Sequence, residues 1–269
     1  MHTDRAPHRG WPLAAALMML GLMVTPALAK HAPAPDPAMH FRWSGVVDAG
    51  KTLEIHGVNG PIRTTLAHGD SVVVTAVKSA NHSDPADVRI EAVPNANGVL
   101  VCARYPRPSG DLNDCTGNQK VEGNDVRVSF NIELPAGVSL VVRSVNGAIE
   151  ARGLKSAVDA STVNGDVRVE TTREARTITV NGNIDVRLAA AALVGPLEFT
   201  TVNGDIGLEL VPAIAADVDA RTTNGSIHCA LAVSDANWSG HRRLRGRLGG
   251  GGPRLRLETV NGSIALRAH

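Results

Sequence analysis

Apolar and polar residues alternate in short stretches along much of the chain, which is the pattern of β-strands with one buried face. Leu53 and Ile55 are separated by one polar residue, and so are Leu255 and Leu257. Further strand-like stretches cover residues 71–77, 87–93, 99–104 and 126–134. We therefore expect an all-β protein.

A five-residue pattern centred on Asn-Gly recurs seven times. Its copies are Val58–Ile62, Val145–Ile149, Val163–Val167, Val180–Ile184, Val202–Ile206, Thr223–Ile227 and Val260–Ile264. From Asn146 onward the spacings are 18, 17, 22, 21 and 37 residues. A period of about 20 residues is typical of stacked repeats. The last spacing corresponds to two periods, with an insertion in place of one repeat.

The position of each Asn in the alternation indicates how the repeats are arranged. Asn-Gly is typical of a two-residue hairpin turn, but the apolar alternation before most copies continues in phase to the Asn. The next apolar residue lies three positions later, so the Gly is expected to be a bend between two strands. We predict a parallel β-solenoid in which stacked Asn side chains form an internal hydrogen-bonded ladder. The alternative is an antiparallel sandwich or hairpin array. The predicted ladder residues are Asn59, Asn146, Asn164, Asn181, Asn203, Asn224 and Asn261.

The N-terminus has the layout of a secretory signal peptide over residues 1–29. Two arginines precede an apolar stretch from Leu13 to Val24, and Ala27–Ala29 is a small-x-small cleavage site. An uncleaved anchor is the alternative. Export to the periplasm, cell surface or medium follows, with no membrane-spanning segment after cleavage. Residues 30–40 are expected to be a flexible lead-in, and residues 41–269 a single domain.

The three cysteines all lie in the exported part of the chain, where disulfides persist. Cys102 and Cys115 flank a polar loop, and we expect them to pair and to contribute on the order of 3 kcal/mol. Cys229 is left over and is expected to be a buried free thiol. A second insertion, residues 234–253, contains the Gly249–Gly252 run and is expected to be an exposed arm.

Charge is balanced over the whole chain but not along it. The formal net charge is +1 and aromatic residues make up 3% of the sequence, which argues against a nucleic-acid binder. Between Asn237 and His269, however, seven arginines accompany one acidic residue. Arginine binds phosphate and carboxylate groups bidentately, so anionic envelope polymers are candidate ligands; an ordinary solvated strand face is the alternative. The candidate binding residues are Arg242, Arg243, Arg245 and Arg247.

Catalytic signatures are weak, and we expect neither enzymatic activity nor a cofactor or metal. Neither G-x-S-x-G nor H-E-x-x-H occurs in the sequence. Only two copies of the repeat carry an acid after the Asn-Gly, at Asp166 and Asp205. The rival hypothesis is a polysaccharide-cleaving enzyme on the same scaffold, with these acids near Arg168 and Arg187.

The T-V-N-G-[DS]-I periodicity, in residues 145–149, 163–167, 202–206, 223–227 and 260–264, resembles the bacterial putative-adhesin family of β-strand-repeat envelope proteins. That family is a domain of unknown function related to the head-GIN-domain adhesins. The resemblance covers about Trp43 to Arg267. It implies a β-solenoid exposed in the envelope or periplasm, with no established enzymatic activity. We therefore expect a structural or adhesin-like binding module, with anionic envelope polymers or another envelope protein as partner. Self-assembly through strand edges stays open.

Overall fold

The computed structural model describes residues 36, 38–115, 121, 123–190 and 192–269, so the predicted signal peptide and most of the predicted lead-in lie outside the described residues. The described chain is built from β-strands, with one 3-10 turn at Pro85–Asp87. The strands are β1 His40–Val46, β2 Thr52–His56, β3 Ile62–Leu66, β4 Ser71–Ser79, β5 Arg89–Asn95, β6 Gly98–Arg104, β7 Arg127–Leu134, β8 Ser139–Arg143, β9 Ile149–Leu154, β10 Val158–Ser161, β11 Val167–Thr171, β12 Ala175–Ile178, β13 Ile184–Leu188, β14 Leu197–Asn203, β15 Ile206–Leu210, β16 Ala216–Asn224, β17 Ile227–Cys229, β18 Ser234–Ser239, β19 Arg243–Leu248, β20 Arg254–Asn261 and β21 Ile264–Ala268.

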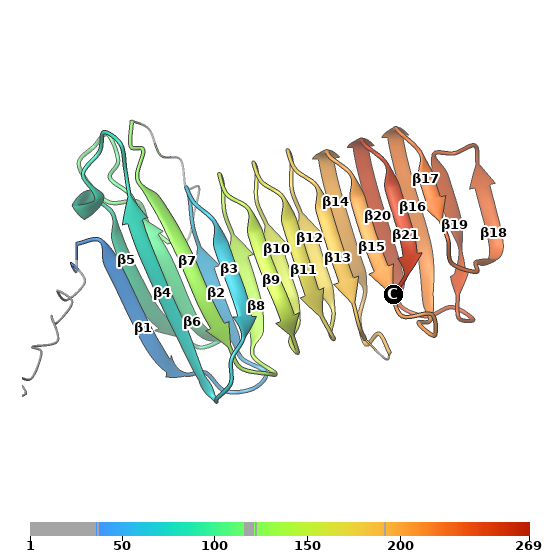
Figure 1. Cartoon of the computed structure of the whole chain (residues 1–269), viewed down its shortest axis with the longest axis horizontal. Coiled ribbons are helices and arrows are strands. Elements are labelled where there is room, and N and C mark those ends of the chain that lie inside the picture. Colours follow the sequence, from blue (N-terminus) through green and yellow to red (C-terminus); the bar gives the residue numbers. More distant parts are fainter. Residues whose placement is uncertain (1–35, 37, 116–120, 122, 191) are drawn as a thin grey trace, which may run out of the picture. The chain divides into compact units, whose positions relative to one another are not determined.

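The strands form two long sheets (Figure 1). Sheet A has the order β1-β4-β7-β3-β9-β11-β13-β15-β21-β17, and sheet B has the order β18-β19-β16-β20-β14-β12-β10-β8-β2-β6-β5. Neighbouring strands are parallel throughout the central part of both sheets, for example β11 with β13 and β12 with β14. Antiparallel pairs occur towards the ends, such as β4 with β7 and β16 with β19. The predicted all-β, mostly parallel solenoid is confirmed.

The core lies between the two sheets because each strand turns alternate side chains inward. Strands β13 and β15, for instance, bury every second residue from end to end. The inward residues of both sheets form one hydrophobic cluster, in which Phe130 and Phe199 are the largest apolar side chains that are fully buried. Outward positions are therefore left for charged and polar groups.

Each repeat forms one coil, which consists of a strand in sheet B, the Asn-Gly turn and a strand in sheet A. The order of the coils along the stack is Asn59, Asn146, Asn164, Asn181, Asn203, Asn261 and Asn224. The last two are reversed relative to the sequence, because β20 lies between β14 and β16. We interpreted the 37-residue spacing as two periods with an insertion in place of one repeat. That interpretation was wrong, because the final repeat, with Asn261, lies in the stack between the repeats of Asn203 and Asn224.

From its glycines we expected the insertion at residues 234–253 to be an exposed arm, but it is part of a sheet. It contains β18 and β19, an antiparallel pair that continues sheet B beyond β16. Leu244 and Leu248 alternate with three arginines and are buried, so β19 has one face on the core, whereas every residue of β18 is exposed. The hydrophobic alternation within the arginine-rich sequence outweighs the flexibility of the glycine run that follows it.

The asparagines of the turns stack along the outside of the solenoid, not inside it. From Asn146 onward, Nδ2 of each Asn donates to Oδ1 of its neighbour in the stack, at 2.7 to 2.9 Å. The bonds are exposed, which corrects the expectation that the Asn share the buried face. The last buried position of the alternation lies two residues before the Asn, and the turn then directs the Asn side chain outward.

That last buried position forms a second ladder. It holds Thr162, Thr179, Thr201, Thr259 and Thr222, all almost fully buried. Each Thr Oγ1 donates to the carbonyl oxygen of a turn Gly in the adjacent coil, at 2.7 to 3.2 Å. These hydroxyls satisfy carbonyl groups at the point where both sheets end, and sequence reasoning treated them only as small residues.

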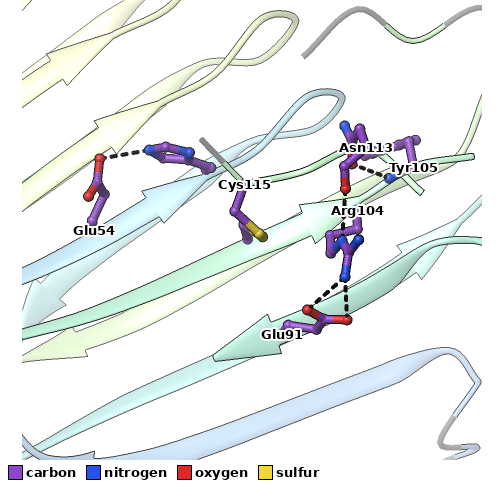
Figure 2. The surroundings of a disulfide bond; sticks show 8 residues. Glu54, Glu91, Arg104, Tyr105, Asn113 and Cys115 are labelled. Carbon is purple, nitrogen blue, oxygen red and sulfur yellow. Dashed lines mark hydrogen bonds and ion pairs between the residues drawn. A yellow bond between two sulfur atoms is a disulfide. The ribbon is translucent and has the colours of Figure 1, made fainter. Parts of the chain in front are cut away.

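A disulfide closes the polar loop that follows β6 in sheet B, at the end of the solenoid opposite to β18 and β19. Cys102 and Cys115 are bonded, and Figure 2 shows Arg104 beside them, donating to Glu91 and to the backbone carbonyl of Asn113. Ala96 and Asn97 form the hairpin turn between β5 and β6, because Gly98 already pairs with Asn95. Cys229 is unpaired but only half-buried, and this partial burial raises the pKa of its thiol.

Candidate anion-binding site

The candidate arginines lie in a sheet, and their neighbours come from two other strands. Alternation along β19 turns Leu244 inward and Arg243 and Arg245 outward. Strand β16 lies beside β19, and β20 lies on the other side of β16. Register places Asp219 of β16 opposite both Arg245 and Arg256.

Asp219 is the centre of this group. Its carboxylate lies 3.4 Å from Nε of Arg245, 3.6 Å from Nη2 of Arg243 and 3.5 Å from Nη2 of Arg254. Three guanidinium groups thus share one carboxylate at distances longer than those of short charge-assisted hydrogen bonds. Much of their positive charge is not neutralised within the protein.

Glu258 of β20 is the second carboxylate in the group. It lies 3.8 Å from Nη2 of Arg221 and accepts a 2.5 Å hydrogen bond from Nη2 of Arg256. This hydrogen bond raises the pKa of the Arg256 guanidinium, which therefore stays charged at any physiological pH.

The side chains surround a depression on the outer face of sheet B. It is lined by Asp219, Arg221, Arg243, Arg245, Arg254, Arg256, Leu257 and Glu258. Five guanidinium groups face two carboxylates there, so the depression carries an excess of positive charge although the chain as a whole is almost neutral. We call this surface the arginine depression.

Only two of the four predicted residues line the arginine depression. Arg243 and Arg245 belong to it, whereas Arg242 lies in the turn before β19 and Arg247 is paired with Asp235. From the sequence, Arg254 and Arg256 fitted a solvated strand face as well as an anion-binding site, and Arg221 was not recognised as a candidate. The available signal was the alternation of β16, which places Asp219 and Arg221 on the same face.

A row of alternating charge continues from the depression across sheet B. In register order it contains Arg245, Asp219, Arg256, Glu198, Arg176 and Asp159. Arg176 lies 2.9 Å from Glu198 and 3.5 Å from Asp159, and the Glu198 hydrogen bond raises the pKa of its guanidinium. Beyond the depression, positive and negative groups therefore balance.

The acids of the rival hypothesis are engaged in the turns. Oδ1 of Asp166 accepts the backbone N–H of Asn183 at 2.9 Å, and Oδ1 of Asp205 accepts that of Ser263 at 2.7 Å. The coil of Asn183 separates the two acids. Arg168 lies 3.6 Å from Asp185, and Arg187 lies 2.9 Å from Glu209. Arg168 also lies 4.0 Å from Asp166, so these two residues face each other, whereas Asp205 and Arg187 have partners outside the set.

Two searches of the described residues gave negative results. No group of three or more His, Cys, Asp or Glu side chains that could hold a metal ion occurs among them. No helix in this part of the chain is long and apolar enough to cross a membrane.

The fold has relatives among known proteins. Similar solved structures include a putative cell adhesion protein from Clostridium sporogenes ATCC 15579, with 11% identity, a TM-score of 0.48 and coverage of 86% of this chain and 100% of that one. A putative adhesin from Bacteroides fragilis NCTC 9343 has 12% identity, a TM-score of 0.38 and coverage of 88% and 99%. No match was found among curated proteins. A family model described as Toastrack DUF4097 matches residues 52–267, and the chain therefore belongs to this family.

Proposed function

We propose that this protein is an exported, non-enzymatic binding module of the bacterial cell envelope, and that the arginine depression binds acidic groups of envelope polymers. The observation that carries the proposal is the sharing of Asp219 by three guanidinium groups, with two more arginines beside them. Guanidinium groups bind phosphate and carboxylate oxygens in pairs. An incoming anion would complete the neutralisation that Asp219 and Glu258 begin.

The rigid scaffold supports the same proposal. The arginines project from three hydrogen-bonded strands whose opposite faces are packed on the core, as Leu244 and Leu257 are. Little backbone conformational entropy is therefore lost when a ligand binds, and the cost that remains is the ordering of the arginine side chains. The exposed arm that we expected from the sequence would not have fixed the backbone in this way.

The test is a binding titration with purified lipopolysaccharide and teichoic acid, with dextran as the uncharged control. We expect Arg245→Ser and Arg256→Ser each to weaken binding roughly ten-fold or more, since each removes hydrogen bonds to a charged group. Arg187→Ser on sheet A is the matched control, and Arg247→Ser should have a smaller effect because this arginine does not line the depression. Equal losses for all four variants would mean that general charge, and not this depression, drives binding.

A complementary variant removes the internal counter-charge. Asp219→Asn leaves the three arginines in place without their shared carboxylate, so we expect it to tighten binding of the anionic polymers. A loss of binding in this variant would show that Asp219 is required to position the arginines.

A further inference from the structure

The last coil of the sequence is not at the end of the stack. Strand β20 lies between β14 and β16, and β21 lies between β15 and β17. The chain therefore passes from β15 to β16 across a gap one coil wide, and residues 254–268, which we call the C-terminal coil, fill this gap afterwards (Figure 1).

The outer strands depend on the C-terminal coil for their attachment. In the described part of the chain β16 pairs with β19 and β20, β17 pairs with β21, and β18 pairs with β19. The outer turn is also attached through the C-terminal coil, because Gly262 N donates to Asn224 O at 3.0 Å and Thr222 Oγ1 donates to Gly262 O at 2.7 Å. All sheet pairing between β16–β19 and the central coils thus passes through the C-terminal coil.

The same coil supplies part of the arginine depression. Arg254, Arg256 and Glu258 come from β20, whereas Asp219 and Arg221 come from β16. The ion pairs Arg254–Asp219, at 3.5 Å, and Arg221–Glu258, at 3.8 Å, join the two strands. Without the C-terminal coil, the depression would lose two of its five arginines.

We infer that insertion of the C-terminal coil assembles the anion site, and that a bound anion in turn holds the coil in the stack. The inference rests on the proposed function for its second half. An anion that contacts β16, β19 and β20 together binds the inserted state in preference to the open one, and it therefore stabilises insertion by linkage. Anion binding and insertion of the C-terminal coil are therefore thermodynamically coupled.

Hydrogen–deuterium exchange on the full exported chain tests both halves. Ile264→Val removes one methyl group from the buried face of β21, and Ile184→Val is the matched control in β13, in the same column of the stack. In Ile264→Val we expect residues 216–248 and 254–268 to exchange faster together, by roughly two- to ten-fold. Ile184→Val should leave the exchange of these residues unchanged.

The ligand arm uses the wild-type chain with dextran sulfate and with uncharged dextran. Dextran sulfate alone should slow exchange in residues 216–248 and 254–268. Continued protection of residues 216–248 in Ile264→Val, while 254–268 exchanges faster, would overturn the assembly role. Unchanged exchange of these residues in the wild type with dextran sulfate bound would overturn the linkage. If the wild type binds no dextran sulfate, the proposed function and the linkage both fail, and the exchange pattern of Ile264→Val still decides the assembly role.

Discussion

At the scale of single residues, the glycine of each central turn is required by close stacking and not by an unusual backbone conformation. A Cβ atom on Gly204 would lie 2.0 Å from the carbonyl oxygen of Gly182, and one on Gly182 would lie 2.1 Å from that of Gly165. Real Cβ atoms do not approach an oxygen so closely. The Asn of the motif makes the outer ladder, and the Gly lets the coils approach.

We expect Gly204→Ala to lower the free energy of unfolding by about 2–3 kcal/mol, because the coils on both sides must separate to admit the methyl group. Gly195→Ala is the control, since its Cβ would meet only the Glu174 side chain, at 3.6 Å, and the change should stay within about 0.5 kcal/mol. Urea denaturation of both variants measures the difference. Equal stabilities would show that the stack tolerates wider spacing.

Asp125 is a second residue whose role is local. Its carboxylate accepts the backbone N–H groups of Asn81 and His82, both at 3.0 Å, and of Ser83 at 2.8 Å. The bonds from Ser83 are the largest cause of a pKa well below the usual range for this carboxyl. A depressed pKa in the folded state means that the stabilisation is complete above the unfolded-state pKa of about 4 and is lost as the pH falls below it.

Asp125→Asn should therefore reduce stability at pH 7, and the gap between wild type and variant should narrow progressively below about pH 4. Urea midpoints of both proteins at pH 7, 4 and 3 provide the measurement. A gap that stays constant over this range would contradict the assigned role of the carboxylate.

At the scale of elements, alternation and the motif were sufficient to predict individual strands. The stretches 71–77, 99–104 and 126–134 became β4, β6 and β7 with small changes of boundary. Coil order could not be predicted in the same way, because the Asn-Gly copies are so alike that each can stack on any other. Alternation places Arg221 on the same outward face as Asp219, but it does not show which strands lie beside them, since the neighbours on β19 and β20 are distant in the sequence.

The disulfide belongs to the element scale because it closes a loop outside the regular coils. Pairing Cys102 with Cys115, 13 positions apart, should contribute about 3 kcal/mol by restricting the unfolded chain. The double variant Cys102→Ala/Cys115→Ala should lose about this amount in urea unfolding. Cys229→Ala should lose much less, and dithiothreitol should destabilise the wild type but not the double variant. Insensitivity of the wild type to the reductant would contradict this contribution.

At the scale of the whole molecule, charge is distributed in two ways. Alternating rows such as Glu198, Arg176, Asp159 and Arg143 neutralise themselves on the central strands. The arginine depression on β16, β19 and β20 is different, because five guanidinium groups there share two carboxylates. A nearly neutral protein thus concentrates positive charge at one end without carrying it over its whole surface.

The measurement that tests the central claim most directly is incubation of the purified protein with lipopolysaccharide, peptidoglycan and acidic polysaccharides. Co-sedimentation and newly released chain ends are scored in the same tubes. We predict co-sedimentation that weakens as salt is raised, that is reduced in Arg245→Ser and Arg256→Ser, and that produces no new ends. Release of new chain ends by the wild type would contradict a non-enzymatic module and would return attention to Asp166 and Asp205.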